Sequence, residues 1–185
     1  MLTSELITKN NLKESLSLQN LIFPRENAKL NYIEAIEERK KSTLPVKFQN
    51  EYFLVRNENK KPVGLWGHYL EGNNKDELWL GWFGVSPFET KKGYGTAIFK
   101  IFEEFARNNG FSTIRLYTDE ADNSLACKLY EKMGMSKEYY ENKEDKTDDI
   151  GKILIYSKSL TEKKVLPWNN KFINYKAQKE KEEIK

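Results

Sequence analysis

The sequence is poor in the residues that build disulfide frameworks and metal sites. Its 185 residues include one cysteine, Cys127, and one histidine, His68. One cysteine cannot form an intrachain disulfide, which suits a reducing compartment. A structural zinc site needs about four ligands, mostly of these two types, so we expect no metal ion. We also expect Cys127 to face a different side of its helix from Tyr130 and to take no part in catalysis.

Long apolar runs and a large excess of one charge are absent as well. No stretch approaches the ~20 apolar residues of a membrane-spanning helix, and the polar beginning (Thr3, Ser4, Glu5) is unlike a signal peptide. Lysine and arginine total 31 against 28 acidic residues, a formal net charge of +3. So small an excess gives no broad basic surface for nucleic acid. We therefore expect a cytoplasmic protein with neither a nucleic-acid nor a membrane partner.

The chain is rich in aromatic residues, which make up 13% of it, beside 32% charged residues. This aromatic content argues against disorder, and the length suits one domain with an appendage. Hydrophobic periodicity predicts helices at about 12–23, 28–39, 94–108 and 124–133, and strands at 52–56, 63–70, 78–85, 113–118, 136–140 and 152–157. Residues 5–8 are a candidate for a short strand or extended segment before the first helix. Asn11 and Asn27 are candidate caps of the first two helices.

The order of these elements predicts the fold class. Strand 78–85 is the most apolar run in the chain, so it belongs at the centre of a sheet that is covered on both faces. Helices come first, then a meander of strands, then alternating strands and helices. We therefore expect an α/β (α+β) fold with a mixed, mostly antiparallel central sheet and helices on both faces.

The segment between the central strand and the helix at 94–108 is typical of a phosphate-binding turn. Gly93 and Gly95 flank Tyr94 at the helix start, where a tight turn exposes several backbone N–H groups. With the positive end of the helix dipole behind them, these donors suit a pyrophosphate, and Lys91 and Lys92 add positive charge. The alternative is that the two glycines only let the chain enter the helix.

The spacing disfavours two other phosphate motifs. A dinucleotide fingerprint needs a third glycine where this chain has Ile98, and it follows its strand at once. Here seven residues, 86–92, separate Val85 from Gly93. The Gly-Lys-Ser/Thr sequence of a nucleoside-triphosphate loop does not occur.

Two linked motifs resemble those of the GNAT family, the Gcn5-related N-acetyltransferases. Val85-Ser86-Pro87 followed by Gly93-Tyr94-Gly95 is similar to the family's coenzyme A signature, Val-x-Pro and then Arg/Gln-x-x-Gly-x-Gly/Ala. The run 123–135 resembles the second signature, Asn-x-x-Ala-x-x-Leu-Tyr-x-Lys-x-Gly-Phe. The resemblance covers roughly residues 2–160. It implies a GNAT-like fold with splayed central strands, and direct transfer of an acetyl group from acetyl-CoA to an amine.

The resemblance also implies which residues hold acetyl-CoA. The backbone of the central strand would pair with the pantetheine arm and polarise the thioester carbonyl, the matching asparagine would contact the same arm, and the glycine turn would hold the pyrophosphate. The residues expected to bind the cofactor are Phe83, Gly84, Val85, Lys91, Lys92, Gly93, Tyr94, Gly95, Thr96 and Asn123. The opening Arg/Gln of the signature falls on Thr90, so we expect weakened binding that relies on backbone amides. Gly84 could instead only make room in a crowded aromatic core.

Tyr130 matches the family tyrosine that acts as general acid toward the sulfur. An unperturbed phenol with a pKa near 10 is protonated at neutral pH and can donate. Asn123 and Tyr130 are seven residues apart, nearly two helical turns, so both can face one cleft. Tyr130 also lies on the apolar stripe of its helix, which leaves a purely structural aromatic residue as the alternative.

The base that deprotonates the amine is less clear. Some family members carry a glutamate on the central strand, but here that position falls on Trp79, which cannot act as a base. Glu77, two residues earlier on the same strand face, is the best substitute. Asp119, Glu120, Asp122, a water relay and capture of the neutral amine stay open, and a carboxylate without a catalytic role explains each residue as well.

Two parts of the chain are expected to differ in role. Residues 1–160 form the acetyltransferase domain, and 161–185 form a C-terminal extension with a docked segment, 166–175, and a solvated tail, 176–185. The docked segment could instead cover a partner subunit in a homodimer.

The acceptor is expected to be an amine on a small molecule or a peptide. Glu34, Glu37 and Glu38 could line an amine site, although a solvated helix face explains them too. Thr90 and the missing strand glutamate leave one alternative, a non-catalytic acyl-CoA-binding module with the same fold.

Overall fold

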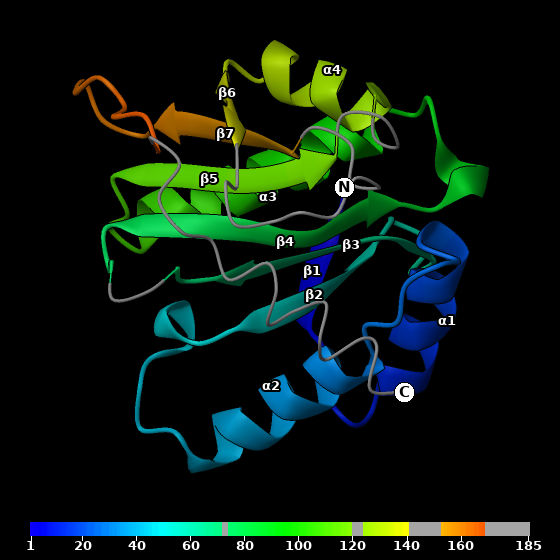
Figure 1. The fold of residues 1–185 in the computed structure, drawn as a ribbon. Helices are drawn as coiled ribbons and strands as arrows, with labels where there is room; N and C mark the ends of the chain where they lie inside the picture. The colour runs from blue at the N-terminus through cyan, green and yellow to red at the C-terminus, as the bar shows by residue number, and fades with distance from the viewer. Residues whose placement is uncertain (72–73, 120–123, 141–152, 169–185) are drawn as a thin grey trace.

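The computed structural model describes residues 1–71, 74–119, 124–140 and 153–168 (Figure 1). Their elements, in chain order, are β1 (Thr3–Leu6), α1 (Leu12–Ile22), α2 (Lys29–Lys41), a 3₁₀ turn (Val46–Phe48), β2 (Glu51–Arg56), β3 (Pro62–Tyr69), β4 (Glu77–Val85), a 3₁₀ turn (Pro87–Glu89), α3 (Tyr94–Asn108), β5 (Thr113–Asp119), α4 (Ser124–Lys132), β6 (Ser136–Tyr140) and β7 (Ile153–Ser159). The predicted elements are confirmed, with bounds that shift by a residue or two. The short strand or extended segment expected at about residues 5–8 is β1, which begins and ends about two residues earlier.

The described strands form one seven-stranded sheet in the order β1-β2-β3-β4-β5-β7-β6 (Figure 1). Neighbouring strands are antiparallel except β4 and β5, which run parallel. Helix α3 lies behind the sheet in this view, and α1 and α2 lie on the opposite face. This arrangement confirms the mixed, mostly antiparallel sheet with helices on both faces and with β4 at its centre.

The two faces of the sheet have separate cores. Helices α3 and α4 share one core with alternate residues of β4, among them Leu78 and Leu80. On the other face, α1 and α2 cover the β1–β3 part of the sheet around Leu54 and Leu65. The β4–β5–β7 part of that face carries a third cluster around Trp79 and Trp168. The space between the second and third clusters is where the cleft described below opens.

The starts of the first two helices differ from the expected caps. Asn11 stands at the N-cap position of α1, but its side chain accepts a hydrogen bond from the Thr8 amide at 2.7 Å and donates to the Leu6 carbonyl at 3.0 Å. It therefore fastens the end of β1 instead of capping the helix. Helix α2 begins after Ala28, and the Asn27 side chain accepts from the amide of residue 29 at 3.0 Å.

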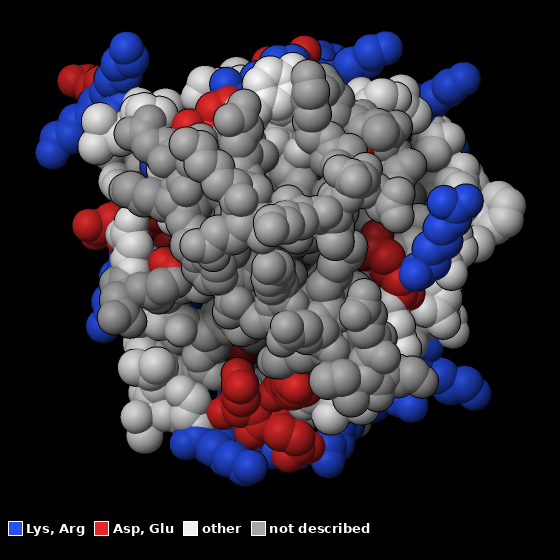
Figure 2. Space-filling view, viewed as in Figure 1, with Lys and Arg blue, Asp and Glu red and all other residues white. Residues whose placement is uncertain are grey.

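Charged side chains are unevenly spread over the face seen in Figure 1. Figure 2 shows acidic side chains gathered in the lower part of this view, over α2, the helix that carries Glu34, Glu37 and Glu38. Glu37 is shared by Lys9 at 3.2 Å and Lys40 at 2.8 Å. The acidic side chains of this helix thus take part in surface ion pairs, each of which contributes little to stability.

Candidate active site

Strands β4 and β5 separate part-way along their length. Their parallel register joins Glu77, Leu78 and Trp79 to residues 113–115, and no further pairing joins these two described strands. Beyond that point β4 continues to Val85 beside β3, and β5 continues to Asp119 beside β7. Alternate backbone N–H groups of β4 therefore point into the gap without a strand partner. The predicted splayed central strands are confirmed.

A β-bulge lies in β4 at the separation. Gly67 pairs with Gly81 and Leu65 with Gly84, so two residues of β4, 82 and 83, stand opposite one residue of β3. Trp82 there has a φ of 46°, a left-handed conformation that is uncommon for a residue other than glycine. Before the bulge Leu80 faces α3 and α4, and after it Phe83 does. The bulge thus keeps apolar side chains on that face while the strand bends.

The gap forms a cleft of about 740 Å³. Its walls come from the chain after α1 (residues 22–26), from β4 (80–83), from β5 (116–119), from α4 (Ala126 and Tyr130), and from Asn31, Tyr52, Tyr69 and Ile153. Backbone groups, a phenol and carboxylates from several elements therefore converge on one space. Such a concave site between parted strands is the best candidate for ligand binding in the described part of the chain.

Tyr130 of α4 lies in the wall of this cleft. Its side chain is 5% exposed and its ring packs against Phe83 at 6.1 Å, Phe99 at 6.2 Å and Tyr156 at 5.2 Å between ring centroids. Burial, with a smaller contribution from Cys127, raises the pKa of the Tyr130 phenol above its ordinary value. The group is therefore a proton donor at neutral pH. The side chain is at once part of the core and part of the cleft.

The expectation that Cys127 faces away from Tyr130 is wrong. Both side chains are among the buried residues of α4. The physical reason is that residues three apart on a helix lie on the same face. Cys127 is a free, buried thiol in the same core cluster as Tyr130, and it does not line the cleft.

Glu77 binds Arg115 where β4 and β5 are still paired, and it lies outside the cleft. Its carboxylate accepts two hydrogen bonds from Arg115, from Nε at 2.9 Å and from Nη2 at 2.8 Å. Arg115 is 2% exposed, so this is a buried ion pair with fork geometry. The described lining of the cleft does not include Glu77. The geometry therefore favours a structural role for Glu77 over the role of base.

Of the other carboxylates considered as base, Asp119 lines the cleft at the end of β5. Glu120, Asp122 and the expected coenzyme ligand Asn123 lie outside the described residues. Glu26, which the sequence analysis did not consider, also lines the cleft, from the chain after α1.

The turn before α3 exposes backbone donors. Lys91 and Gly93 have φ angles of 62° and 80°, and the first helical hydrogen bond of α3 runs from the Ala97 amide to the Gly93 carbonyl at 3.1 Å. The amides of residues 94–96 have no acceptor among the described residues, as expected for a helix start. Open donors at the positive end of a helix dipole fit a pyrophosphate, so this structure has the features that a coenzyme A phosphate needs.

The lysines of this turn have different surroundings. Lys92 donates to Glu89 at 2.7 Å, and Lys61 donates to the same carboxylate at 2.6 Å. Glu89 is only 4% exposed, and these two ammonium groups hold its pKa below the ordinary value. Lys92 thus has a partner already, while the Lys91 side chain is exposed. Thr90, where the signature has Arg/Gln, turns its hydroxyl to the Pro87 carbonyl at 3.3 Å.

Gly84 is required by packing as well as by any ligand. A Cβ built on Gly84 would lie 2.4 Å from Cγ2 of Ile22 and 3.0 Å from the ring of Phe23. The absence of a side chain lets the end of α1 approach β4. The alternative considered for this glycine, room in a crowded core, is therefore supported, although the backbone of Gly84 still borders the gap.

His68 is a core residue. It is 0% exposed, its ring stacks on Phe105 at 4.8 Å, and burial lowers its pKa to about 3. The imidazole is therefore neutral near pH 7 and is not among the residues that line the cleft.

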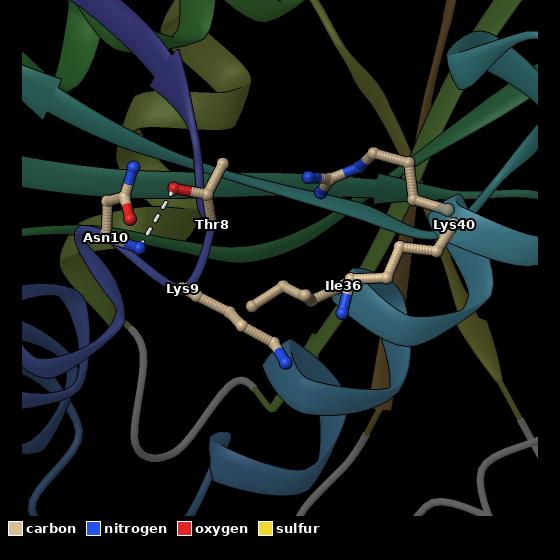
Figure 3. A pocket seen from close by; sticks show the side chains of 6 residues that line it. Thr8, Lys9, Asn10, Ile36 and Lys40 are labelled. Carbon is tan, nitrogen blue, oxygen red and sulfur yellow. Dashed lines mark hydrogen bonds between the residues drawn. The ribbon is translucent and has the colours of Figure 1, made fainter.

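A second, smaller hollow of about 380 Å³ lies between the loop after β1 and α2 (Figure 3). Its lining includes Thr8, Lys9, Arg39 and Lys40 and shares no residue with the cleft. Arg39 is bound to the carboxylate of Glu51 and to the carbonyl of residue 7. The Arg39 guanidinium is thus already bound within the protein. Unlike the cleft, the hollow does not bring together backbone groups, a phenol and carboxylates from several elements.

Comparisons with known proteins agree with this geometry. The model of the acetyltransferase (GNAT) family matches residues 16–135. The chain belongs to the GNAT family of acetyltransferases. No curated protein matches it in a sequence search.

Solved structures share the GNAT fold. The ribosomal-protein-S18-alanine N-acetyltransferase of Escherichia coli has a TM-score of 0.66 at 17% identity over 93% of this chain and 100% of its own. The spermidine N-acetyltransferase of Vibrio cholerae, solved with CoA and spermine, has a TM-score of 0.65 at 15% identity over 85% and 95%. A GNAT acetyltransferase of Elizabethkingia anophelis with acetyl-CoA bound has a TM-score of 0.64 at 15% identity over 86% and 98%. At such identities the likeness shows the fold alone.

Membrane-spanning helices and metal-binding clusters are both absent from the described residues. No helix there is both long and apolar enough to cross a bilayer. No group of three or more His, Cys, Asp or Glu side chains there could hold a metal ion.

Sequence reasoning missed the tyrosines of the cleft. Tyr52, Tyr69 and Tyr117 lie on β2, β3 and β5, far apart in the sequence, and they meet only because those strands are assembled in one sheet. Burial, and then the nearby carboxylate of Glu34, raise the pKa of Tyr52. The sequence does place these tyrosines on predicted strands. Only the order of the strands in the sheet shows that the tyrosines lie near the gap.

Proposed function

We propose that this GNAT protein is an N-acetyltransferase that transfers an acetyl group from acetyl-CoA directly to the amine of a small molecule or a peptide. The observation that carries the proposal is the separation of β4 and β5 beside Tyr130. One gap provides unpaired backbone donors, room for an extended thioester and a protonated phenol.

The residues of this chain fit acetyl-CoA in two places. The open amides of residues 94–96, with Lys91 beside them, would bind the pyrophosphate. The unpaired edge of β4 at Phe83, Gly84 and Val85 would bind the pantetheine arm and orient the thioester carbonyl. Lys92 remains in the proposed cofactor site for its charge beside the glycines, and Asn123 remains there on the family resemblance. When bound, acetyl-CoA supplies the activated acetyl group.

The transfer needs two proton movements. As the amine nitrogen bonds to the carbonyl carbon, the carbon–sulfur bond breaks and the sulfur takes a proton from the Tyr130 hydroxyl. The nitrogen attacks in its neutral form, an ammonium having first released one proton to solvent. The proton that the nitrogen loses on bonding to the carbonyl carbon we assign to Asp119, directly or through water, because Asp119 lines the cleft and Glu77 does not. The Tyr130 phenol then regains a proton from solvent.

The cleft favours an amine that is positively charged in solution. Three tyrosines, Tyr52, Tyr69 and Tyr117, and two carboxylates, Glu26 and Asp119, border it. Aromatic faces and carboxylates both attract ammonium groups. The related structures named above acetylate a protein alanine in one case and spermidine in another. The single, buried Cys127 also suits the proposed cytoplasmic compartment.

The test is release of free coenzyme A from acetyl-CoA in the presence of polyamines, aminoglycosides, amino acids and peptides, with mass spectrometry of the acetylated product. The proposal expects turnover with at least one amine. Measurable binding of coenzyme A without turnover of any of them would instead favour a non-catalytic acyl-CoA-binding module. Two observations support that alternative. Thr90 stands where the family signature has Arg/Gln, and Glu77 is held in an ion pair with Arg115.

A further inference from the structure

The sheet face that carries α1 and α2 is covered in two different ways. The two helices cover its β1–β3 part, whereas the β4–β5–β7 part is covered by Trp168 from the C-terminal extension. Trp168 is 6% exposed, so it is buried within a single chain and does not need a partner subunit to cover it. The cleft opens between these two covers.

The segment 166–168 is anchored by a buried charge. Arg115 donates through Nη2 to the carbonyl of Leu166 at 2.8 Å, while the same guanidinium binds Glu77 and the Ser157 hydroxyl, the latter at 2.6 Å. The backbone amide of Trp168 donates to the carboxylate of Glu138. The guanidinium carbon also lies 5.4 Å from the Trp168 ring centroid. One arginine therefore joins the separation of β4 and β5 to the extension.

Ring contacts connect Trp168 to the cleft. Its ring meets Trp79 edge-on at 4.9 Å, and Trp79 packs against Tyr69 at 6.0 Å between ring centroids. Tyr69 and Tyr117 pack on this cluster, and both line the cleft. The Tyr69 hydroxyl is buried and has no hydrogen-bond partner among the residues that the structure describes. A buried hydroxyl without a partner is unfavourable, so a ligand that bonds to it gains free energy.

We propose that the segment 166–168 completes the acceptor site. Trp168 is a positioning residue that holds Trp79, and through it Tyr69, at the wall of the cleft, where the Tyr69 hydroxyl accepts a hydrogen bond from a cationic amine. This inference rests on the proposed function, since the cleft receives an acceptor only if the amine binds there. It also means that the functional unit extends past residue 160, to Trp168.

The experiment measures binding of spermidine, as a cationic amine, to the full chain saturated with coenzyme A, by titration calorimetry. Trp168→Ala and Tyr69→Phe are each expected to weaken spermidine binding about five-fold or more, and to leave the Kd for coenzyme A within about two-fold. Lys164→Ala, an exposed position four residues before Trp168, is the matched control with unchanged binding. A double variant is expected to lose no more than the larger single effect, because Trp168 acts through Tyr69.

Trp168→Ala removes a large buried ring, so its thermal unfolding is measured in parallel. Should it be unfolded at the assay temperature, Trp168→Phe replaces it, with an intermediate loss of spermidine binding expected. Unchanged spermidine affinity in a folded Trp168 variant would overturn the inference, as would a wild-type protein that binds coenzyme A but no spermidine. Spermidine binding that depends on Trp168, without acetyl transfer, would support the inference and contradict the proposed function.

Discussion

Arg115 and Glu77 form a two-point hydrogen-bonded ion pair at the place where β4 and β5 stop pairing. The last paired residues of the two strands, Trp79 and Arg115, mark the closed end of the gap. A rigid, buried connection there fixes where the strands separate. The pair therefore supports the site without contacting the reaction.

The first prediction concerns Glu77→Gln. If Glu77 is structural, the variant should keep its kcat within a few-fold but lose about 2–3 kcal/mol of unfolding free energy, because a buried arginine loses its counter-charge. Thermal or urea unfolding and steady-state kinetics check the two expectations. A fall in kcat of about 100-fold in a variant of unchanged stability would instead restore Glu77 as the base.

The second prediction uses two glycines of the same conformation. Gly93 and Gly110 stand at opposite ends of α3 with φ angles of 80° and 82°, and a Cβ at either would meet nothing within 4 Å. Replacement of either glycine by alanine should lower the free energy of unfolding by about 1 kcal/mol through backbone strain alone.

Only Gly93→Ala should also weaken the binding of coenzyme A, by about ten-fold, because Gly93 shapes the turn that presents the amides of residues 94–96. Gly110→Ala is the control for strain. Calorimetric Kd values for coenzyme A decide the matter, and equal affinities in the two variants would show that the turn does not hold the pyrophosphate.

The third prediction concerns pH. Because burial lowers the pKa of His68 from 6.5 to about 3, the folded protein keeps this imidazole neutral where the unfolded chain protonates it. Its contribution to stability is full above pH 6.5 and is lost as the pH falls toward 3, by about 1.4 kcal/mol per pH unit.

His68→Phe should flatten this part of the acid response. Urea unfolding of both proteins between about pH 7 and pH 4.5 gives the difference in slope. Parallel curves would mean that His68 is already protonated, or hydrated, in the folded state.

Much of the fold could be predicted from the sequence because its signals are local. Helix α3 has an apolar stripe and a glycine beyond each end, and β4 is an apolar run bounded by turns, so both were located correctly. The parting of the central strands came from the family resemblance. The side of α4 on which Cys127 lies was misjudged, although helical geometry alone places it beside Tyr130.

The remaining features depend on contacts between distant residues. Glu77 meets Arg115 across 38 positions of sequence, and Arg115 meets the carbonyl of Leu166 across 51. The bulge at Trp82 puts a tryptophan in a conformation that local preference disfavours. No local pattern predicts such features, because the assembled sheet provides the energy that holds them.

The most direct measurement of the central claim is the steady-state kinetics of Tyr130→Phe with acetyl-CoA and an accepted amine. The account predicts that kcat falls about 100-fold or more, while the Kd for coenzyme A and the stability of the fold change little, since the Tyr130 hydroxyl makes no hydrogen bond within the described part of the chain. A variant that keeps full turnover, or that loses activity only because it unfolds, would contradict the assignment of Tyr130 as the acid in the gap between β4 and β5.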